Sequence, residues 1–142
     1  FTAFMRSIGD DKTRLDRREP ELNEATPGDA RDTTTPIAAA RSLQTLLLDG
    51  VLSAPARNEL TQWMLGDQVA DALLRAGLPR DWQIADKSGA GGHGSRSIIA
   101  VVWPPKRSAV IVAIYITQTA ASMSASNQAV SRIGSALAKA LQ

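Results

Sequence analysis

Apolar residues recur at helical spacing in three segments before residue 80. Thr35-Pro36 provides a capping hydroxyl and an N1 proline, so a helix is expected to begin there and to end near Gly50. Ser53 begins a second expected helix, and residues 68–76 form a third, shorter one. The predicted apolar faces are Ala40, Leu43 and Leu47 in the first helix and Leu60, Trp63 and Met64 in the second.

The pattern changes to strands after Asp81. Trp82 and Ile84 alternate with polar residues, and the continuous apolar runs 97–103 and 109–116 flank a turn at 104–107. This order predicts an antiparallel meander, and runs without alternation indicate helices on both sheet faces. A last helix is predicted along the sheet, with an apolar face of Met123, Val130, Ile133, Leu137 and Leu141.

Residues 10–35 are highly charged and nearly free of apolar periodicity, so we expect a long loop held by its own ion pairs. Residues 1–9 resemble the last turns of a helix that Gly9 stops, rather than the start of a protein. We therefore divide the chain into 1–35 (helix end and loop), 36–80 (helical insert) and 81–142 (three strands and a helix), one incomplete structural unit.

Composition narrows the chemistry. The 142 residues are 44% hydrophobic and 21% charged, which is typical of a globular domain, and no apolar run is long enough for a membrane span. The chain has no cysteine and one histidine, His93, which excludes disulfide scaffolds, thiolate catalysis and cysteine- or histidine-rich metal sites.

The charge distribution is uneven. Residues 1–86 hold 10 basic and 14 acidic residues, a net charge of −4, whereas residues 87–142 hold six basic and no acidic residues, a net charge of +6. The positive electrostatic field of residues 87–142 would attract anions, although a solvated basic face explains the same charges equally well. Nucleic acid is disfavoured as a partner, because the six charges are dispersed and not interleaved with aromatic residues.

Two segments carry candidate chemistry. Glu19 and Asn23, four residues apart, could hold one water between a proton-accepting carboxylate and an orienting amide, although charged loops often contain such residues. Lys87 and Ser88, expected at a strand end beside glycine-rich residues 89–92, together with Arg96 offer two cations and a hydroxyl to a carboxylate or phosphate. A glycine-rich bend without a ligand is the alternative for the second segment.

Taken together, these segments resemble the C-terminal half of the class A serine β-lactamases. The resemblance covers the whole chain and rests on four tracts in the family's order: Arg14-Leu15-Asp16-Arg17, Glu19-Pro20-Glu21-Leu22-Asn23, Arg31-Asp32-Thr33-Thr34-Thr35-Pro36 and Asp86-Lys87-Ser88-Gly89-Ala90-Gly91. It implies the serine β-lactamase/penicillin-binding fold, an α+β sandwich with an antiparallel sheet between helices. It also implies that residues 10–35 are the family's Ω-loop.

The resemblance assigns a role to each matched residue. Glu19 would activate the deacylating water that Asn23 helps to hold, and a cis Glu19–Pro20 peptide is usual. Arg17 and Asp32 would pair across the neck of the loop. Substrate binding would involve catalytic Lys87 together with Ser88, Gly89, Ala90 and Arg96, with the Ala90 amide in the oxyanion hole. Gly91 replaces the cysteine of the carbapenemase subgroup, while residues 92–94 and 100–103 are closer to the carbenicillin-hydrolysing branch.

The family's nucleophile motif Ser-x-x-Lys and its Ser-Asp-Asn motif are absent from these 142 residues. The chain alone is therefore expected to be inactive and to need an N-terminal half that carries both motifs. The resemblance implies penicillins and cephalosporins as substrates, no cofactor or metal, and a monomeric, periplasmic or secreted enzyme without membrane or nucleic-acid partners. The alternatives are a penicillin-binding transpeptidase or carboxypeptidase, which would lack Glu19 and its water, and a non-catalytic anion-binding module.

Overall fold

The computed structural model describes residues 1–141. Its elements, in chain order, are α1 (Thr2–Ser7), the 3₁₀ turn η1 (Glu21–Asn23), α2 (Pro36–Leu47), α3 (Ala54–Leu65), the 3₁₀ turn η2 (Leu74–Gly77), β1 (Gln83–Ala90), β2 (Arg96–Trp103), β3 (Val110–Ile116) and α4 (Met123–Leu141). The predicted helix starts are confirmed, since Thr35 and Ser53 are the N-caps of α2 and α3. No helix among these residues is long and apolar enough to cross a bilayer.

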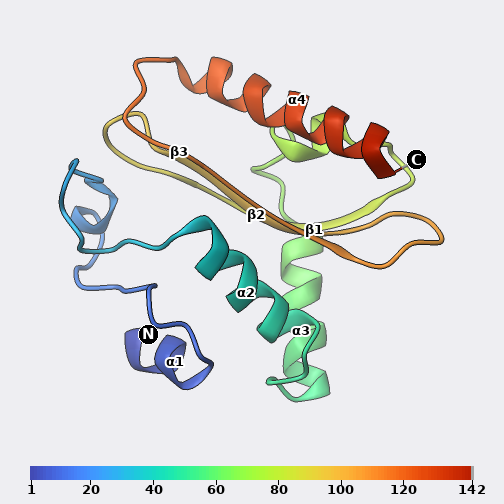
Figure 1. Ribbon diagram of the computed structural model, residues 1–142, viewed down its shortest axis with the longest axis horizontal. Coiled ribbons are helices and arrows are strands. Elements are labelled where there is room, and N and C mark those ends of the chain that lie inside the picture. The colour runs from blue at the N-terminus through green and yellow to red at the C-terminus, as the bar shows by residue number, and fades with distance from the viewer. Residues whose placement is uncertain (142) are drawn as a thin grey trace.

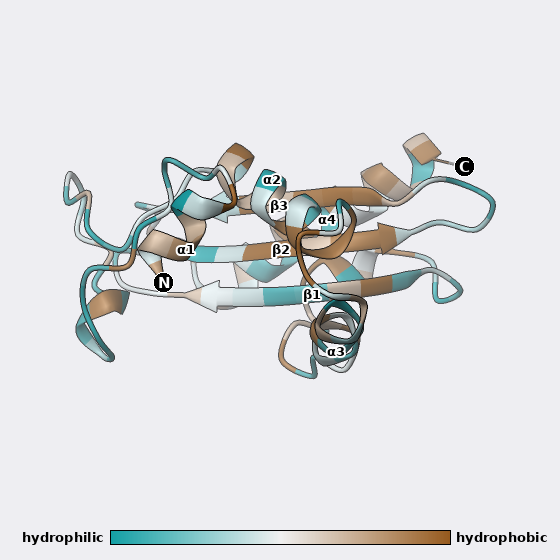
Figure 2. Cartoon of the chain, turned by 90° about the horizontal axis from the view of Figure 1, so that it is seen from below, coloured by the Kyte–Doolittle hydropathy of each residue, from teal (hydrophilic) through white to brown (hydrophobic). Residues whose placement is uncertain are grey.

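The three strands form the predicted antiparallel meander in the order β1-β2-β3. Helix α4 covers one face of the sheet, and α2 and α3 lie against the other (Figure 1). The view in Figure 2 shows β2 between its neighbours, with hydrophobic residues along β2 and β3 and a hydrophilic middle in β1. The sandwich expected from the sequence is therefore present.

Two apolar clusters explain why the β2 sequence does not alternate. Successive side chains of β2 point to opposite faces of the sheet. Because both faces are covered, the odd-numbered and the even-numbered residues must both be apolar. The cluster facing α4 and η2 contains Ala70, Leu73, Leu74, Ile84, Ile98, Ala100, Val102 and Val130. The cluster facing α2 and α3 contains Leu43, Leu47, Met64, Ala85 and Val101. Strand β3, at the edge of the sheet, is only half-buried.

The predicted helix over residues 68–76 is wrong. Asp67 Oδ1 accepts the Val69 amide at 2.6 Å, which forms a turn, and Leu73 has φ −98° and ψ −123°, outside the helical region. Only the 3₁₀ turn η2 follows. The side chain of Arg75 explains why η2 stays close to the sheet, because it donates to the carboxylate of Asp86 on β1.

Two predicted apolar faces also need correction. Trp63 is 66% exposed, and the residues of α3 that pack in the core are Leu60, Met64 and Leu65. In α4, Met123 and Ile133 are exposed. The residues of α4 that are buried are Ser126, Val130, Gly134 and Ala138, spaced by four, three of them small.

Small residues allow α4 to approach η2 closely. A Cβ on Gly134 would lie 2.7 Å from the carbonyl oxygen of Leu74, and a Cβ on Gly77 would overlap the carbonyl oxygen of Ser131. The helix therefore packs backbone against backbone at this point, which a face of large apolar residues would prevent.

Candidate active site

The loop over residues 10–35 is closed at its neck by Arg17 and Asp32. Arg17 Nε donates to Asp32 Oδ2 at 2.6 Å, and Asp32 Oδ1 accepts the backbone amides of Asp16 and Arg17 at 2.6 and 2.9 Å. Burial alone would raise the pKa of Asp32, but the hydrogen bonds from Arg17 and from the two amides lower it to about 2. The carboxylate, only 3% exposed, is thus held ionised across the neck.

Arg17 has a second partner that the sequence reasoning missed. Its Nη1 lies 2.5 Å from Glu24 Oε2, so one guanidinium joins the neck of the loop to the end of η1. Further ion pairs, Arg14–Asp16 and Arg31–Asp29, lie in the same loop. The expectation that the loop is held by its own charges is confirmed, whereas nothing in the spacing of Arg17 and Glu24 distinguished this pair from the others.

Glu19 and Asn23 lie next to each other. The Glu19–Pro20 peptide bond is cis, the turn η1 follows it, and the Asn23 side-chain amide donates to Glu19 Oε2. The backbone amide of Asn23 donates to the carbonyl of Pro20 at 3.1 Å, which fixes the turn that brings the two side chains together. Glu19 is exposed and Asn23 half-buried, so a carboxylate and an amide face solvent side by side.

Lys87 and Ser88 lie within β1 and not at its end, contrary to the sequence-based prediction. The ladder continues to Ala90 because β2 begins at Arg96 and pairs with it. By strand alternation, Ser88 and Arg96 point to the sheet face that carries α4, and Lys87 points to the other face. Lys87 Nζ donates to the carbonyl of Ser88 at 2.6 Å. The structure thus groups Ser88 with Arg96 and places Lys87 across the strand from them.

Arg96 is 7% exposed and held on two sides. Its Nη1 donates to the carbonyl of Gly89 at 3.0 Å, and its Nε donates to Asn127 Oδ1 on α4 at 2.9 Å. Among residues 1–141, its Nη2 makes no hydrogen bond, so both N–H groups of this nitrogen remain available to an anion. Asn127 was missed by the sequence reasoning, because 31 residues separate it from Arg96.

The two segments meet at the turn between β1 and β2. The amide of Gly92 donates to the carbonyl of Asn23 at 2.7 Å, and a Cβ on Gly91 would lie 2.8 Å from the same oxygen. Beside this contact is a cavity of about 620 Å³ between the loop and the ends of the strands. Residues that line it include Asn23, Gly89, Ala90, Gly91 and Arg96. Glu19 and Lys87 are joined by no hydrogen bond or ion pair in the described part of the chain.

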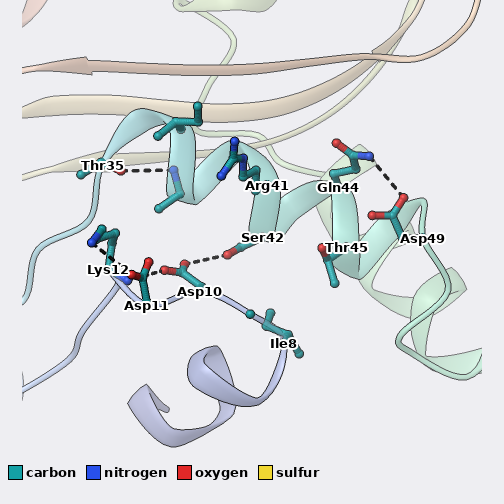
Figure 3. A pocket seen from close by; sticks show the side chains of 13 residues that line it. Ile8, Asp10, Asp11, Lys12, Thr35, Arg41, Ser42, Gln44, Thr45 and Asp49 are labelled. Atoms are coloured by element: carbon teal, nitrogen blue, oxygen red, sulfur yellow. Dashed lines mark hydrogen bonds and ion pairs between the residues drawn. The ribbon is translucent and has the colours of Figure 1, made fainter.

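A second cavity, of about 600 Å³, lies between α2 and residues 8–12, which follow α1 (Figure 3). At its wall Asp10 accepts from Ser42 at 2.7 Å and from the amides of Lys12 and Thr13 at 2.9 and 2.8 Å. Burial would raise the pKa of Asp10, but these hydrogen bonds and that of the Thr13 hydroxyl lower it to about 2. All the donors are protein groups, so Asp10 acts as a structural tie. No group of three metal-ligating side chains occurs among residues 1–141.

Comparison with known proteins gives one consistent family. A model described as "Beta-lactamase enzyme family" matches residues 1–141. "Beta-lactamase AER-1" of Aeromonas hydrophila is 69% identical over 134 residues, which is 94% of this chain and 44% of that protein. "Beta-lactamase CARB-4" of Pseudomonas aeruginosa is 53% identical over 133 residues, which is 94% of this chain and 46% of that protein.

Solved structures agree with the sequence matches. The chain aligns with an "Ancestral (GNCA) Beta-lactamase class A" at a TM-score of 0.96 and 50% identity, covering 98% of this chain and 54% of that one. The chromosome-encoded β-lactamase of Vibrio parahaemolyticus aligns at a TM-score of 0.95 and 48% identity, covering 99% and 54%. The chain thus spans about half the length of the relatives it matches.

Proposed function

The chain belongs to the family of class A serine β-lactamases, and from that membership we propose that it supplies the deacylation base and the substrate-carboxylate site of an enzyme that hydrolyses β-lactams. The observation that carries the proposal is the hydrogen bond between Asn23 and Glu19, a carboxylate and an amide held side by side at the surface of the Ω-loop. The serine that forms the acyl-enzyme would come from an N-terminal segment with the Ser-x-x-Lys motif.

In this mechanism Glu19 takes a proton from a water that Asn23 orients, and the resulting hydroxide attacks the acyl-enzyme ester. The negative charge on the ester oxygen is stabilised by the Ala90 amide, and the proton passes from Glu19 to the leaving serine oxygen. The arrangement separates base and binding site: the base lies on the loop, and the binding groups lie on the hairpin.

The substrate carboxylate would lie beside Arg96 and Ser88. Both point to the same face of the sheet, and the guanidinium of Arg96 has one nitrogen without a partner among residues 1–141. Lys87 approaches from the other side of β1, where it would contribute to the positive potential and contact the N-terminal segment. The absence of acidic residues after Asp86 strengthens this potential. We place the complete enzyme in the periplasm or outside the cell.

The test uses the chain completed with the N-terminal portion of the Aeromonas hydrophila relative. The completed enzyme should hydrolyse a penicillin, and Glu19→Gln should lower deacylation by about 10²–10⁴-fold, so that the acyl-enzyme accumulates in intact-mass spectra. Glu21→Gln, the same change two residues away, is the matched control and should turn over normally. Undiminished turnover in Glu19→Gln would contradict the role of Glu19. A long-lived acyl-enzyme in the parent would favour a penicillin-binding protein.

A further inference from the structure

The turn between β1 and β2 is hydrogen-bonded to the Ω-loop at two consecutive carbonyl groups. The amide of Gly92 donates to the carbonyl of Asn23 at 2.7 Å. The Nδ1 atom of His93 lies 3.1 Å from the carbonyl oxygen of Glu24. Because a carbonyl oxygen only accepts hydrogen bonds, Nδ1 must carry the proton, in the neutral or the protonated imidazole alike. Adjacent donors on one turn thus hold adjacent acceptors on the loop.

The geometry of the turn favours this contact. His93 has φ +53°, in the left-handed region that non-glycine residues seldom occupy, so its backbone conformation is set by the turn. There is no space for a Cβ at position 92, where it would overlap the carbonyl of Glu24. The glycine lets the two backbones meet, and the neighbouring imidazole then reaches the loop.

Asn23 and Glu24, whose carbonyl groups the turn binds, also carry side chains that hold the loop together. The side-chain amide of Asn23 donates a hydrogen bond to Glu19. The carboxylate of Glu24 accepts one from Nη1 of Arg17, the residue that closes the neck of the loop with Asp32. A shift of the backbone at positions 23 and 24 would therefore move the amide that orients the water and loosen the tie to Arg17.

We propose that His93 is a positioning residue for deacylation, which with the Gly92 amide fixes the Ω-loop at Asn23–Glu24 and so aligns Asn23 with Glu19. This inference rests on the proposed function of Glu19 and Asn23. It assigns a role in catalysis to a residue outside the four matched tracts, acting through its bond to a carbonyl and not by contact with substrate.

The experiment compares three variants in the completed enzyme. His93→Gly keeps the left-handed turn but removes the donor, whereas His93→Asn keeps the turn and places an amide N–H where Nδ1 was. Lys106→Gly is the matched control, because Lys106 also has a positive φ, of +59°, but lies in the turn at the opposite end of β2. Acylation and deacylation rates are measured separately, with the acyl-enzyme quantified by mass spectrometry and the folded state by thermal unfolding.

Loss of one neutral hydrogen bond should slow deacylation about three- to tenfold in His93→Gly, with acylation unchanged and more acyl-enzyme at steady state. His93→Asn should restore the deacylation rate to within about twofold, and Lys106→Gly should match the parent. Unchanged deacylation in His93→Gly, an equal loss in His93→Asn, or an equal loss of acylation would each overturn the proposal. An inactive parent would instead contradict the proposed function.

Discussion

At the scale of the residue, Thr35 shows what one hydroxyl contributes to a helix start. Its Oγ1 accepts the Ala38 amide at 3.2 Å, and Pro36 occupies the first helical position, where no amide donor is needed. Ser53 occupies the same position before α3, but its bond to the Ala56 amide is 3.5 Å long. The two caps therefore differ in strength, and the proline that follows them differs in place, at the first helical position of α2 and the second of α3.

Thr35→Ala should destabilise the completed enzyme by about 1 kcal/mol, a loss of about 2–4 °C in Tm, because an amide at the start of α2 loses its acceptor. Thr35→Ser retains the acceptor and should unfold near the parent's temperature. Ser53→Ala, where the bond is longer, should cost less than Thr35→Ala. Thermal unfolding of the three variants checks the order, and equal stability of Thr35→Ala and Thr35→Ser would contradict it.

At the scale of the element, the contact of α4 with η2 determines the effect of a methyl group at Gly134. Replacing a helical glycine by alanine usually stabilises a helix by about 1 kcal/mol. Here the new Cβ would lie 2.7 Å from the carbonyl of Leu74 and 3.3 Å from the Cα of Gly77. Because both neighbours are backbone atoms, the clash is relieved only by moving η2 away from α4.

Gly134→Ala should therefore destabilise the completed enzyme, by about 1–3 kcal/mol, instead of stabilising it. Gly66→Ala is the matched control: Gly66 ends α3 with φ −84°, and a Cβ there would be in ordinary contact at 3.4 Å. Urea unfolding measures both. A gain in stability for Gly134→Ala would show that η2 is not held as closely as the structure indicates.

The packing of α4 against η2 also shows which features of the helices and strands the sequence could predict. Helix caps and unbroken strand runs are local signals, and Thr35, Ser53 and the β2 run were interpreted correctly. The face of α4 was predicted from its large residues, yet Gly134 and Ala138 are buried and Ile133 is exposed, because close packing selects small residues. Local periodicity contains no information about how near a partner lies.

For the candidate site, the motifs located the residues, but their arrangement required the fold. Glu19 and Asn23 are four residues apart in a turn, so their proximity is local. The bond from Arg96 to Asn127 joins β2 to α4 and has no counterpart in spacing. Strand alternation alone could have separated Lys87 from Ser88, since adjacent residues of a strand point to opposite faces.

At the scale of the whole molecule, the sheet has two outer edges, on β1 and β3, and neither is paired among the described residues. Strand β3 has neither a charged residue nor a proline, which usually protect an edge from pairing. The chain also spans about half the length of its relatives. Its proposed activity therefore belongs to the completed enzyme, and in that proposal the loop over residues 10–35 must stay attached to the core for Glu19 to be in place.

That attachment depends on pH through Asp10 and Asp32. Both have pKa values lowered to about 2, below the 3.8 of an ordinary aspartate. For a carboxyl with a lowered pKa in the folded state, the stabilisation is complete above the unfolded pKa and is lost as the pH falls through the folded pKa. The pKa of Asp86 is shifted in the opposite direction, because burial raises it despite the hydrogen bonds from Arg75. Protonation of Asp86 in acid is therefore not a source of unfolding.

The completed enzyme should accordingly lose stability between about pH 4 and pH 2, with the urea midpoint falling steeply across that interval. Asp10→Asn and Asp32→Asn should each lower the stability at pH 6. In the double variant, stability should fall less steeply with pH on the acid side (the acid limb of the curve), since fewer protons are taken up on unfolding. Asp11→Asn is the control, because Asp11 is 76% exposed and its ion pair is with its exposed neighbour Lys12. An acid limb of unchanged slope in the double variant would show that other carboxyl groups govern acid unfolding, and that these two ties do not couple the loop's stability to pH.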